Sequence, residues 1–138
     1  MLAIDIDLGT TTCIAVCTNS EPEVLPNSLG QMTTPSYVAT TEDNGILQDC
    51  EHWSFWIVEV GSKLKSADGN RTLEPEAVAS HLLSELKENA SYAPGKNVTD
   101  AVITIPAYFN NIQRDATKLS VHMSGLNTLH IINEQTSA

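Results

Sequence analysis

The sequence predicts an α/β domain in which helices pack on a mixed β-sheet. Three patterns carry this prediction: two β-type runs flank a short polar turn near the start, a helix-type run begins at residue 75, and the C-terminal third reads as strand, helix and strand. Two short strands joined by a tight turn pair antiparallel, whereas a strand–helix–strand unit gives a parallel crossover, so the sheet is expected to be mixed. A chain of 138 residues is sized for one domain with a modest core.

The amino-terminal part is expected to consist of strands. Residues 2–8 and 13–17 are short apolar or β-branched runs on either side of Gly9, a pattern typical of a hairpin with a polar tip. Turn signals with proline, asparagine and glycine bound a short strand at residues 23–25, and residues 35–40 predict another strand.

The middle of the chain carries one clear helix. Residues 45–70 lose the regular hydrophobic pattern: they contain an apolar cluster of Trp53 and residues 55–58, and a turn is expected at residues 67–70. A helix is predicted for residues 75–89, because Pro75 suits the first helical position and valine and leucine then recur at helical spacing.

The C-terminal third predicts a crossover unit. Residues 101–105 form a β-branched run typical of a strand buried on both faces, and a proline ends it. Asn110 or Asn111 can cap a second helix that runs to Met123, and a strand at residues 126–132 follows a glycine stop signal.

Composition excludes several classes of partner. Seventeen acidic and seven basic residues give a net charge of −10, which argues against nucleic acid or an anionic membrane as a partner. No apolar run is long enough to span a bilayer, and the start lacks the features of a secretory signal. We therefore expect a cytoplasmic protein, with an organellar location left open.

The cysteines and histidines do not predict a direct metal site. Cys13, Cys17 and Cys50 have no ligand-like spacing to the four histidines, so we interpret them as core thiols in a reducing compartment.

The tip of the first hairpin is the first candidate site. Asp7, Gly9, Thr10 and Thr11 place a carboxylate beside a glycine turn whose backbone N–H groups and hydroxyls can surround a phosphate. A carboxylate repels a polyphosphate unless Mg²⁺ lies between them, so Asp7 would face the water shell of the metal. Glycine and threonine are also common in hairpin turns for conformational reasons alone, and this second interpretation stays open.

Two further candidate segments follow strand ends. Residues 105–117 contain a strand end, a turn and a capped helix start with Arg114, and residues 131–136 place Glu134 just beyond another strand. Ligands of open α/β sheets bind at such carboxyl ends. Asp7 and Glu134 could together hold a hydrated Mg²⁺, or Arg114 and Glu134 could simply be surface charges.

These segments resemble one family. In order along the chain, four stretches resemble segments of the amino-terminal ATPase lobe of the 70-kilodalton heat-shock protein (DnaK) chaperone family, which is related to actin and the sugar kinases: residues 6–11, 22–27 with 30–36, 105–117 and 131–136. The resemblance extends from one end of the chain to the other. It implies an α/β fold that forms part of one lobe of an actin-like ATPase, with a mixed sheet and packed helices.

The resemblance also implies roles for site residues. Thr10 and Thr11 would touch the β- and γ-phosphates of ATP or ADP beside Gly9, Asp7 would bind the waters of Mg²⁺, and Glu134 would lie near the same waters as a candidate catalytic residue.

Signalling roles are implied as well. The residues that match Pro106, Arg114 and Glu134 relay the nucleotide state in the family, and co-chaperones are candidate partners beside the nucleotide itself.

The sequence departs from the family in ways that bear on activity. Between residues 47–50 and 52–55 the family carries several tens of further residues, among them a lysine that assists cleavage of the γ-phosphate. The first hairpin is one residue short, since only Thr12 separates Thr11 from Cys13, and such a change can reverse the faces of a strand.

We therefore expect residues 1–138 to form an incomplete first lobe, with a reduced peripheral subdomain at about 36–72. No counterpart of the second lobe or of the peptide-binding domain is recognised. The first hypothesis is an ATP-binding chaperone fragment with weak nucleotide binding and no turnover of its own. The alternative is a non-catalytic interaction module or a decayed, truncated gene product without independent activity.

Overall fold

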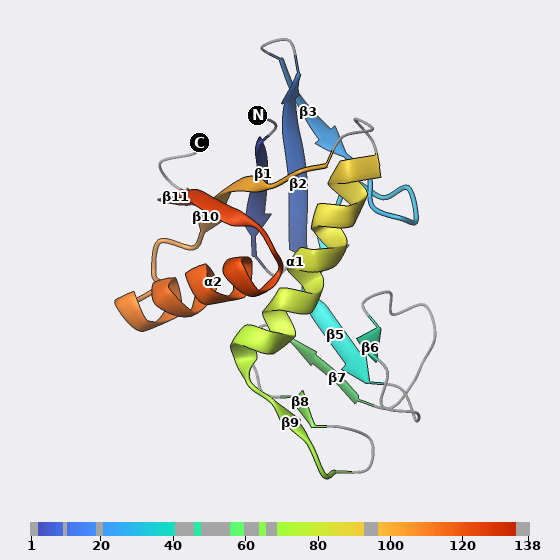
Figure 1. The fold of residues 1–138 in the computed structure, drawn as a ribbon, viewed down its shortest axis with the longest axis vertical. Helices are drawn as coiled ribbons and strands as arrows, with labels where there is room; N and C mark the ends of the chain where they lie inside the picture. The colour runs from blue at the N-terminus through green and yellow to red at the C-terminus, as the bar shows by residue number, and fades with distance from the viewer. Residues whose placement is uncertain are drawn as a thin grey trace.

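The computed structural model describes residues 3–9, 11–18, 21–40, 46–47, 56–59, 64–65, 69–92 and 97–134. Its main sheet is mixed and has six strands, in the order β11-β10-β1-β2-β3, with β4 pairing to β2 (Figure 1). These strands are β1 (Ala3–Leu8), β2 (Thr11–Thr18), β3 (Glu21–Leu25), β4 (Thr34–Pro35), β10 (Asp100–Ile105) and β11 (Asn127–Asn133). The α/β fold with a mixed sheet that the sequence predicts is confirmed.

The first hairpin forms as the sequence predicts. β1 and β2 pair antiparallel, with Ile6 opposite Ile14 and Asp7 opposite Cys13. Because side chains alternate along a strand, the isoleucines face the core while Asp7 and Cys13 face the other side of the sheet. The short turn is therefore compatible with an apolar inner face on both strands.

Two helices connect and cover the sheet. Helix α1 (Pro75–Tyr92) extends three residues beyond the predicted end at residue 89, because buried Ala90 continues its apolar face. Helix α2 (Asn111–Met123) joins β10 to β11, which run parallel, so the predicted crossover is confirmed. Gly125 ends this helix with φ of 77°, a left-handed conformation that suits glycine.

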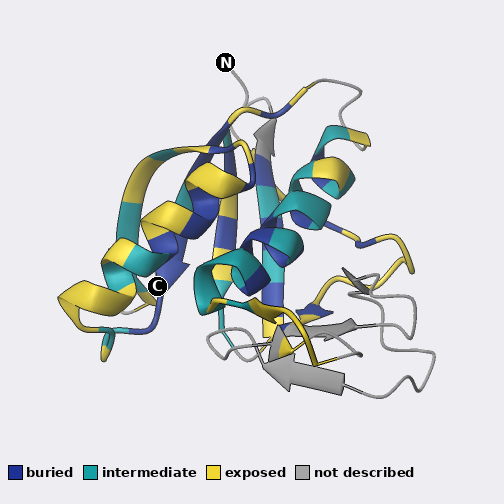
Figure 2. Cartoon of the chain, turned by 60° about the horizontal axis from the view of Figure 1, so that its bottom comes forward, coloured by how far each residue is buried: buried dark blue, intermediate teal, exposed yellow. Residues whose placement is uncertain are grey.

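The core lies between the helices and one face of the main sheet. Apolar residues of α1 and α2, with no more than a few per cent of their surface exposed, pack against isoleucines and valines from β1, β2 and β10. Figure 2 shows the buried residues on the sides of the helices that face the strands. Both helices that the structure describes lie on this face, and the opposite face carries Asp5 and Asp7.

Two small sheets lie apart from the main sheet. One contains β5 (Tyr37–Thr40), β6 (Ile46–Leu47) and β7 (Trp56–Glu59), and the other pairs β8 (Leu64–Lys65) with β9 (Thr72–Leu73). The sequence pattern assigns no strand to residues 45–70, whereas β7 forms there because pairing with distant β5 stabilises a segment too short to show a period. Of the predicted turn, residues 67–68 lie outside the described residues, and Gly69 has φ of 73°.

One prediction about the thiols is corrected. Cys13 is free and partly exposed on the Asp7 face of the sheet, so it is not a core thiol. The side chains of the other two cysteines lie outside the described part of the chain. Neither described helix is both long enough and apolar enough to cross a membrane.

Candidate functional site

The candidate residues gather at one edge of the main sheet. Strands β1, β10 and β11 run parallel, with Asp7 in register with Thr104 and Thr104 in register with Ile132. The carboxyl ends of all three strands therefore meet at the same edge. This is the position at which ligands of open α/β sheets bind.

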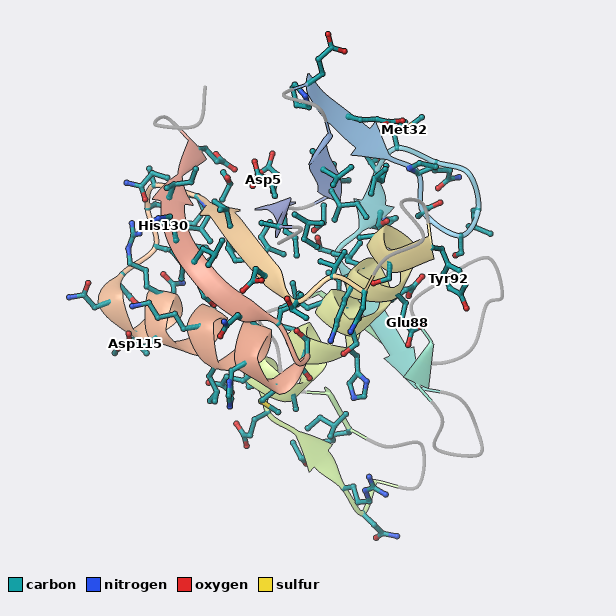
Figure 3. All side chains as sticks on the ribbon, turned by 45° about the horizontal axis from the view of Figure 1, so that its top comes forward. Asp5, Met32, Glu88, Tyr92, Asp115 and His130 are labelled. Atoms are coloured by element: carbon teal, nitrogen blue, oxygen red, sulfur yellow. The ribbon has the colours of Figure 1, made fainter. Side chains whose placement is uncertain are left out.

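Two carboxylates from β1 share the open face near this edge. Asp5 and Asp7 are exposed and two residues apart, so they point to the same side. The Thr104 hydroxyl donates a long hydrogen bond of 3.4 Å to Oδ1 of Asp5. Desolvation on the sheet surface raises the pKa of Asp5; the hydrogen bond from Thr104 opposes this shift and the nearby charge of Asp7 adds to it. Figure 3 labels Asp5 in the middle of the main sheet.

Cys13 lies beside these carboxylates. It faces Asp7 across the β1–β2 pair, and desolvation, followed by the charges of Asp7 and Asp5, raises the pKa of its thiol. The thiol is therefore held in its protonated, weakly nucleophilic form.

The turn between β1 and β2 is packed closely against residue 36. The Ser36 hydroxyl donates to the Gly9 carbonyl over 2.6 Å, and its oxygen lies 2.8 Å from the hydroxyl oxygen of buried Thr12. A Cβ atom added at Gly9 would lie 3.2 Å from the backbone oxygen of Thr11, so the turn leaves little room for a side chain. Thr11 is exposed at the start of β2, and the predicted ligand Thr10 lies outside the described residues.

The second segment begins at buried Pro106, directly after β10. A capping box starts α2: the Asn110 side chain accepts from the Gln113 N–H, and the Gln113 side chain accepts from the Asn110 N–H, both over 2.9 Å. One turn into this region, Arg114 donates from Nη2 to the side-chain oxygen of Asn133 over 2.7 Å. The guanidinium therefore ties the start of α2 to the end of β11.

Glu134 follows Asn133 and is exposed. Pro106, Arg114 and Glu134 thus meet at the edge that also carries Asp7 and Gly9. The structure brings these predicted site residues to one edge from three separate segments.

The geometry is compatible with a hydrated Mg²⁺. Asp7 and the end of β11 are separated by two strand spacings, about 10 Å between the backbones, which leaves room for an ion with its water shell. Among the described residues, no group of three or more acidic, histidine or cysteine side chains could hold a metal. The donor set is therefore compatible with a hydrated ion whose waters contact the carboxylates.

A cavity of about 380 Å³ opens at the same edge on the helix side. Gly9, Ser36 and Pro106 line it together with Phe109 and Ile112, so its wall is mostly apolar. The rings of Tyr108 and Phe109 pack edge to face, with centroids 5.6 Å apart.

Sequence reasoning missed several residues at this edge. Asp5 and Thr104 could have been found from strand alternation, which places Asp5 on the face of Asp7. Ser36 and Asn133 left no usable signal, because their partners Gly9 and Arg114 are distant in the chain.

Comparison with known proteins identifies a common family. The family model described as "Hsp70 protein" matches residues 3–47 and 40–138. A heat shock 70 kDa protein II of Paracentrotus lividus is 36% identical over 174 residues, and a putative heat shock 70 kDa protein 7 of Homo sapiens is 37% identical over 175 residues. A ribosome-associated molecular chaperone of Saccharomyces cerevisiae is 33% identical over 173 residues. Each alignment covers 99% of this chain and, in the same order, 47%, 48% and 28% of the relative.

Proposed function

The chain belongs to the Hsp70 family, and from this premise we propose that it is an ATP-binding chaperone segment that holds the phosphates of ATP or ADP at the β1–β2 turn. Chaperone function and binding of ATP or ADP with Mg²⁺ are general properties of this family. This chain spans about half the length of two of these relatives. We therefore propose nucleotide binding for this chain, and ATP-dependent protein folding only for a longer protein of the family.

One observation carries the proposal. Three motif segments that are distant in the sequence lie at the same sheet edge, which carries Asp7 and Gly9 at the end of β1 and, two strands away, Arg114 and Glu134 at the end of β11. A glycine turn offers backbone N–H groups to phosphate oxygens, and carboxylates on the open face can orient a hydrated metal.

Bound Mg²⁺ would neutralise charge between the phosphates and the protein. Asp7 is the residue that would hold its waters, and Glu134 would contact the same water shell from the end of β11. The chain has a net charge of −10, so an uncompensated polyphosphate would be repelled.

We expect no hydrolysis by the chain alone. The two matches of the family model meet at residues 40–47, which supports the interpretation that the family's lysine segment is missing after residue 47. Loss of one preorganised charge-stabilising group typically costs about 10²–10³ in rate. Arg114 is not expected to replace this lysine: the resemblance gives it a relay role, and its guanidinium donates to Asn133 at the end of β11.

Calorimetry tests the binding. With Mg²⁺ present we expect ATP to bind with a dissociation constant of order millimolar, about 4 kcal/mol, since the turn supplies phosphate contacts but no partner for the adenosine is recognised. Asp7→Ala should reduce the dependence on Mg²⁺, and Asp115→Ala on the exposed surface of α2 is the control with the same loss of charge. Micromolar binding that is indifferent to Mg²⁺ would contradict the proposal.

Phosphate release tests the turnover. Purified chain with saturating Mg²⁺ and ATP is expected to release phosphate at the rate of the buffer blank. Hydrolysis that is measurable and that Glu134→Ala abolishes would show that the chain completes a catalytic site without the lysine segment.

A second candidate function is that of a non-catalytic interaction module. The outer surface of α2 exposes Ile112, Leu119 and Met123, with 79%, 49% and 49% of their surface accessible. Apolar side chains at this spacing form one stripe along a helix, a feature of protein-binding surfaces. Co-chaperones are the partner class that the family suggests.

A further inference from the structure

Ser36 connects the small sheet of β5, β6 and β7 to the candidate phosphate site at the β1–β2 turn. It lies between β4 and β5, and only 3% of its surface is exposed. Its hydroxyl contacts Gly9 at 2.6 Å and Thr12 at 2.8 Å, although these residues are 27 and 24 positions away in the chain. Backbone pairing supports the same junction, because β4 pairs with the start of β2.

The proton count gives these contacts a direction. A serine hydroxyl has one proton, and the Gly9 carbonyl can only accept. Since Ser36 donates to Gly9, the hydrogen bond between the two hydroxyls must be donated by Thr12. The result is a buried chain in which Thr12 donates to Ser36 and Ser36 donates to Gly9.

These two hydrogen bonds hold the Gly9 carbonyl, whose direction decides whether the turn can accept an anion. A carbonyl oxygen repels phosphate oxygens, and a carbonyl engaged by a buried hydroxyl cannot also turn toward a bound phosphate. Gly9 has no side chain that could hold its own carbonyl, and a Cβ added there would lie 3.2 Å from the Thr11 carbonyl oxygen. Among the described residues, Ser36 supplies the side-chain hydrogen bond that holds the Gly9 carbonyl.

We propose that Ser36 is a positioning residue that fixes the Gly9 peptide for phosphate binding and ties the turn to the segment leading into β5. The role in binding rests on the proposed function, whereas the ordering of the turn does not. A displacement of β5 would then be transmitted to the turn through this hydroxyl group, beside the backbone pairing of β4 with β2.

The test measures order in the turn first, without nucleotide. In ¹⁵N relaxation of the full chain, the Gly9 and Thr11 amides are expected to have order parameters of about 0.85, and Ser36→Ala is expected to lower them below about 0.6. Ser36→Thr keeps the hydroxyl and should recover the wild-type values. Ser84→Ala is the matched control, because it removes a hydroxyl that donates to a backbone carbonyl in α1, far from the turn in the chain.

A second arm measures affinity. We expect Ser36→Ala to weaken Mg²⁺–ATP binding about fivefold, the effect of one hydrogen bond, and Ser84→Ala to leave it unchanged. Thr12→Val is the variant to use if Ser36→Ala fails to fold; it removes the donor to Ser36 and should loosen the turn less, since the bond to Gly9 remains.

The outcomes separate the two proposals. Order parameters at Gly9 that are low in the wild type, or that stay near 0.85 in the variant, would overturn the role of Ser36. If the wild type binds no Mg²⁺–ATP but Ser36→Ala still disorders the turn, the proposed function fails and the positioning role stands.

Discussion

At the scale of single residues, Asp5 shows how position on a strand sets the chemistry of a carboxylate. It lies on the open face of the main sheet, where its pKa is raised, chiefly by desolvation, with an opposing hydrogen bond from Thr104 and a smaller contribution from Asp7. Because the pKa of Asp5 in the folded state lies above its usual value of 3.8, the Asp5 carboxylate binds a proton more readily in the folded state than in the unfolded state.

The raised pKa gives a prediction with a definite sign. Stability from the protonated Asp5 is present at low pH and is lost as the pH rises through its folded pKa. Asp5→Asn should therefore raise the melting temperature at pH 7, and the gain should disappear near pH 3.5, below the unfolded pKa. Asp115→Asn removes the same charge from the exposed surface of α2 and should change little at either pH. A melting temperature at pH 7 that is lower in Asp5→Asn than in the wild type would contradict this account.

Residue-level predictions from the sequence succeed where the signal is local. The turn motif around Gly9 and the helix cap at Asn110 can be read from neighbouring residues. Ser36 could not be predicted, because its hydrogen bonds join segments that only the folded sheet brings together.

At the scale of elements, α2 links the two parts of the site. Its first turn carries Arg114, whose hydrogen bond to Asn133 joins the helix to the end of β11. The helix start must therefore be well formed for this contact to persist. The capping box of Asn110 and Gln113 satisfies N–H groups that the helix itself leaves unpaired.

Removal of the cap should weaken this element. We expect Asn110→Ala to lower the free energy of unfolding by about 1 kcal/mol, the typical cost of losing such a cap. Asn111→Ala changes the next residue, which is exposed and not the cap, and should stay within about 0.5 kcal/mol of the wild type. Urea unfolding measures both, and equal midpoints for the wild type and Asn110→Ala would show that the cap contributes nothing.

Elements with long periodic or apolar runs were predicted correctly, whereas β7 was missed. Helices α1 and α2 and strand β10 carry their pattern in their own residues. The short strand β7 depends on its partner β5, so no local pattern marks it.

At the scale of the whole molecule, the two described helices pack on one face of the main sheet, and the carboxylates Asp5 and Asp7 lie on the other. The described helices cover one face of the main sheet, and β11 forms an edge strand with Leu129 40% exposed. An edge strand without charged side chains other than histidine, such as β11, is a ready site for pairing with another chain.

This exposure predicts self-association or marginal folding. Sedimentation velocity should show species larger than the monomer as the protein concentration rises, and calorimetry should show a broad melt. Leu129→Lys places a charge on the exposed edge and should favour the monomer, with Gln31→Lys, at an exposed position outside the strands, as the control for the added charge. A sharp two-state melt of a monomer above about 60 °C would contradict the prediction.

The placement of the phosphates at the β1–β2 turn is the central claim. Chemical-shift mapping of the full chain during titration with ATP and Mg²⁺ tests it most directly. We expect the largest amide shifts at Asp7, Gly9 and Thr11, with smaller shifts at Arg114 and a strong reduction when Mg²⁺ is removed. Shifts that cluster elsewhere, or no shifts at millimolar ATP with excess Mg²⁺, would contradict the account.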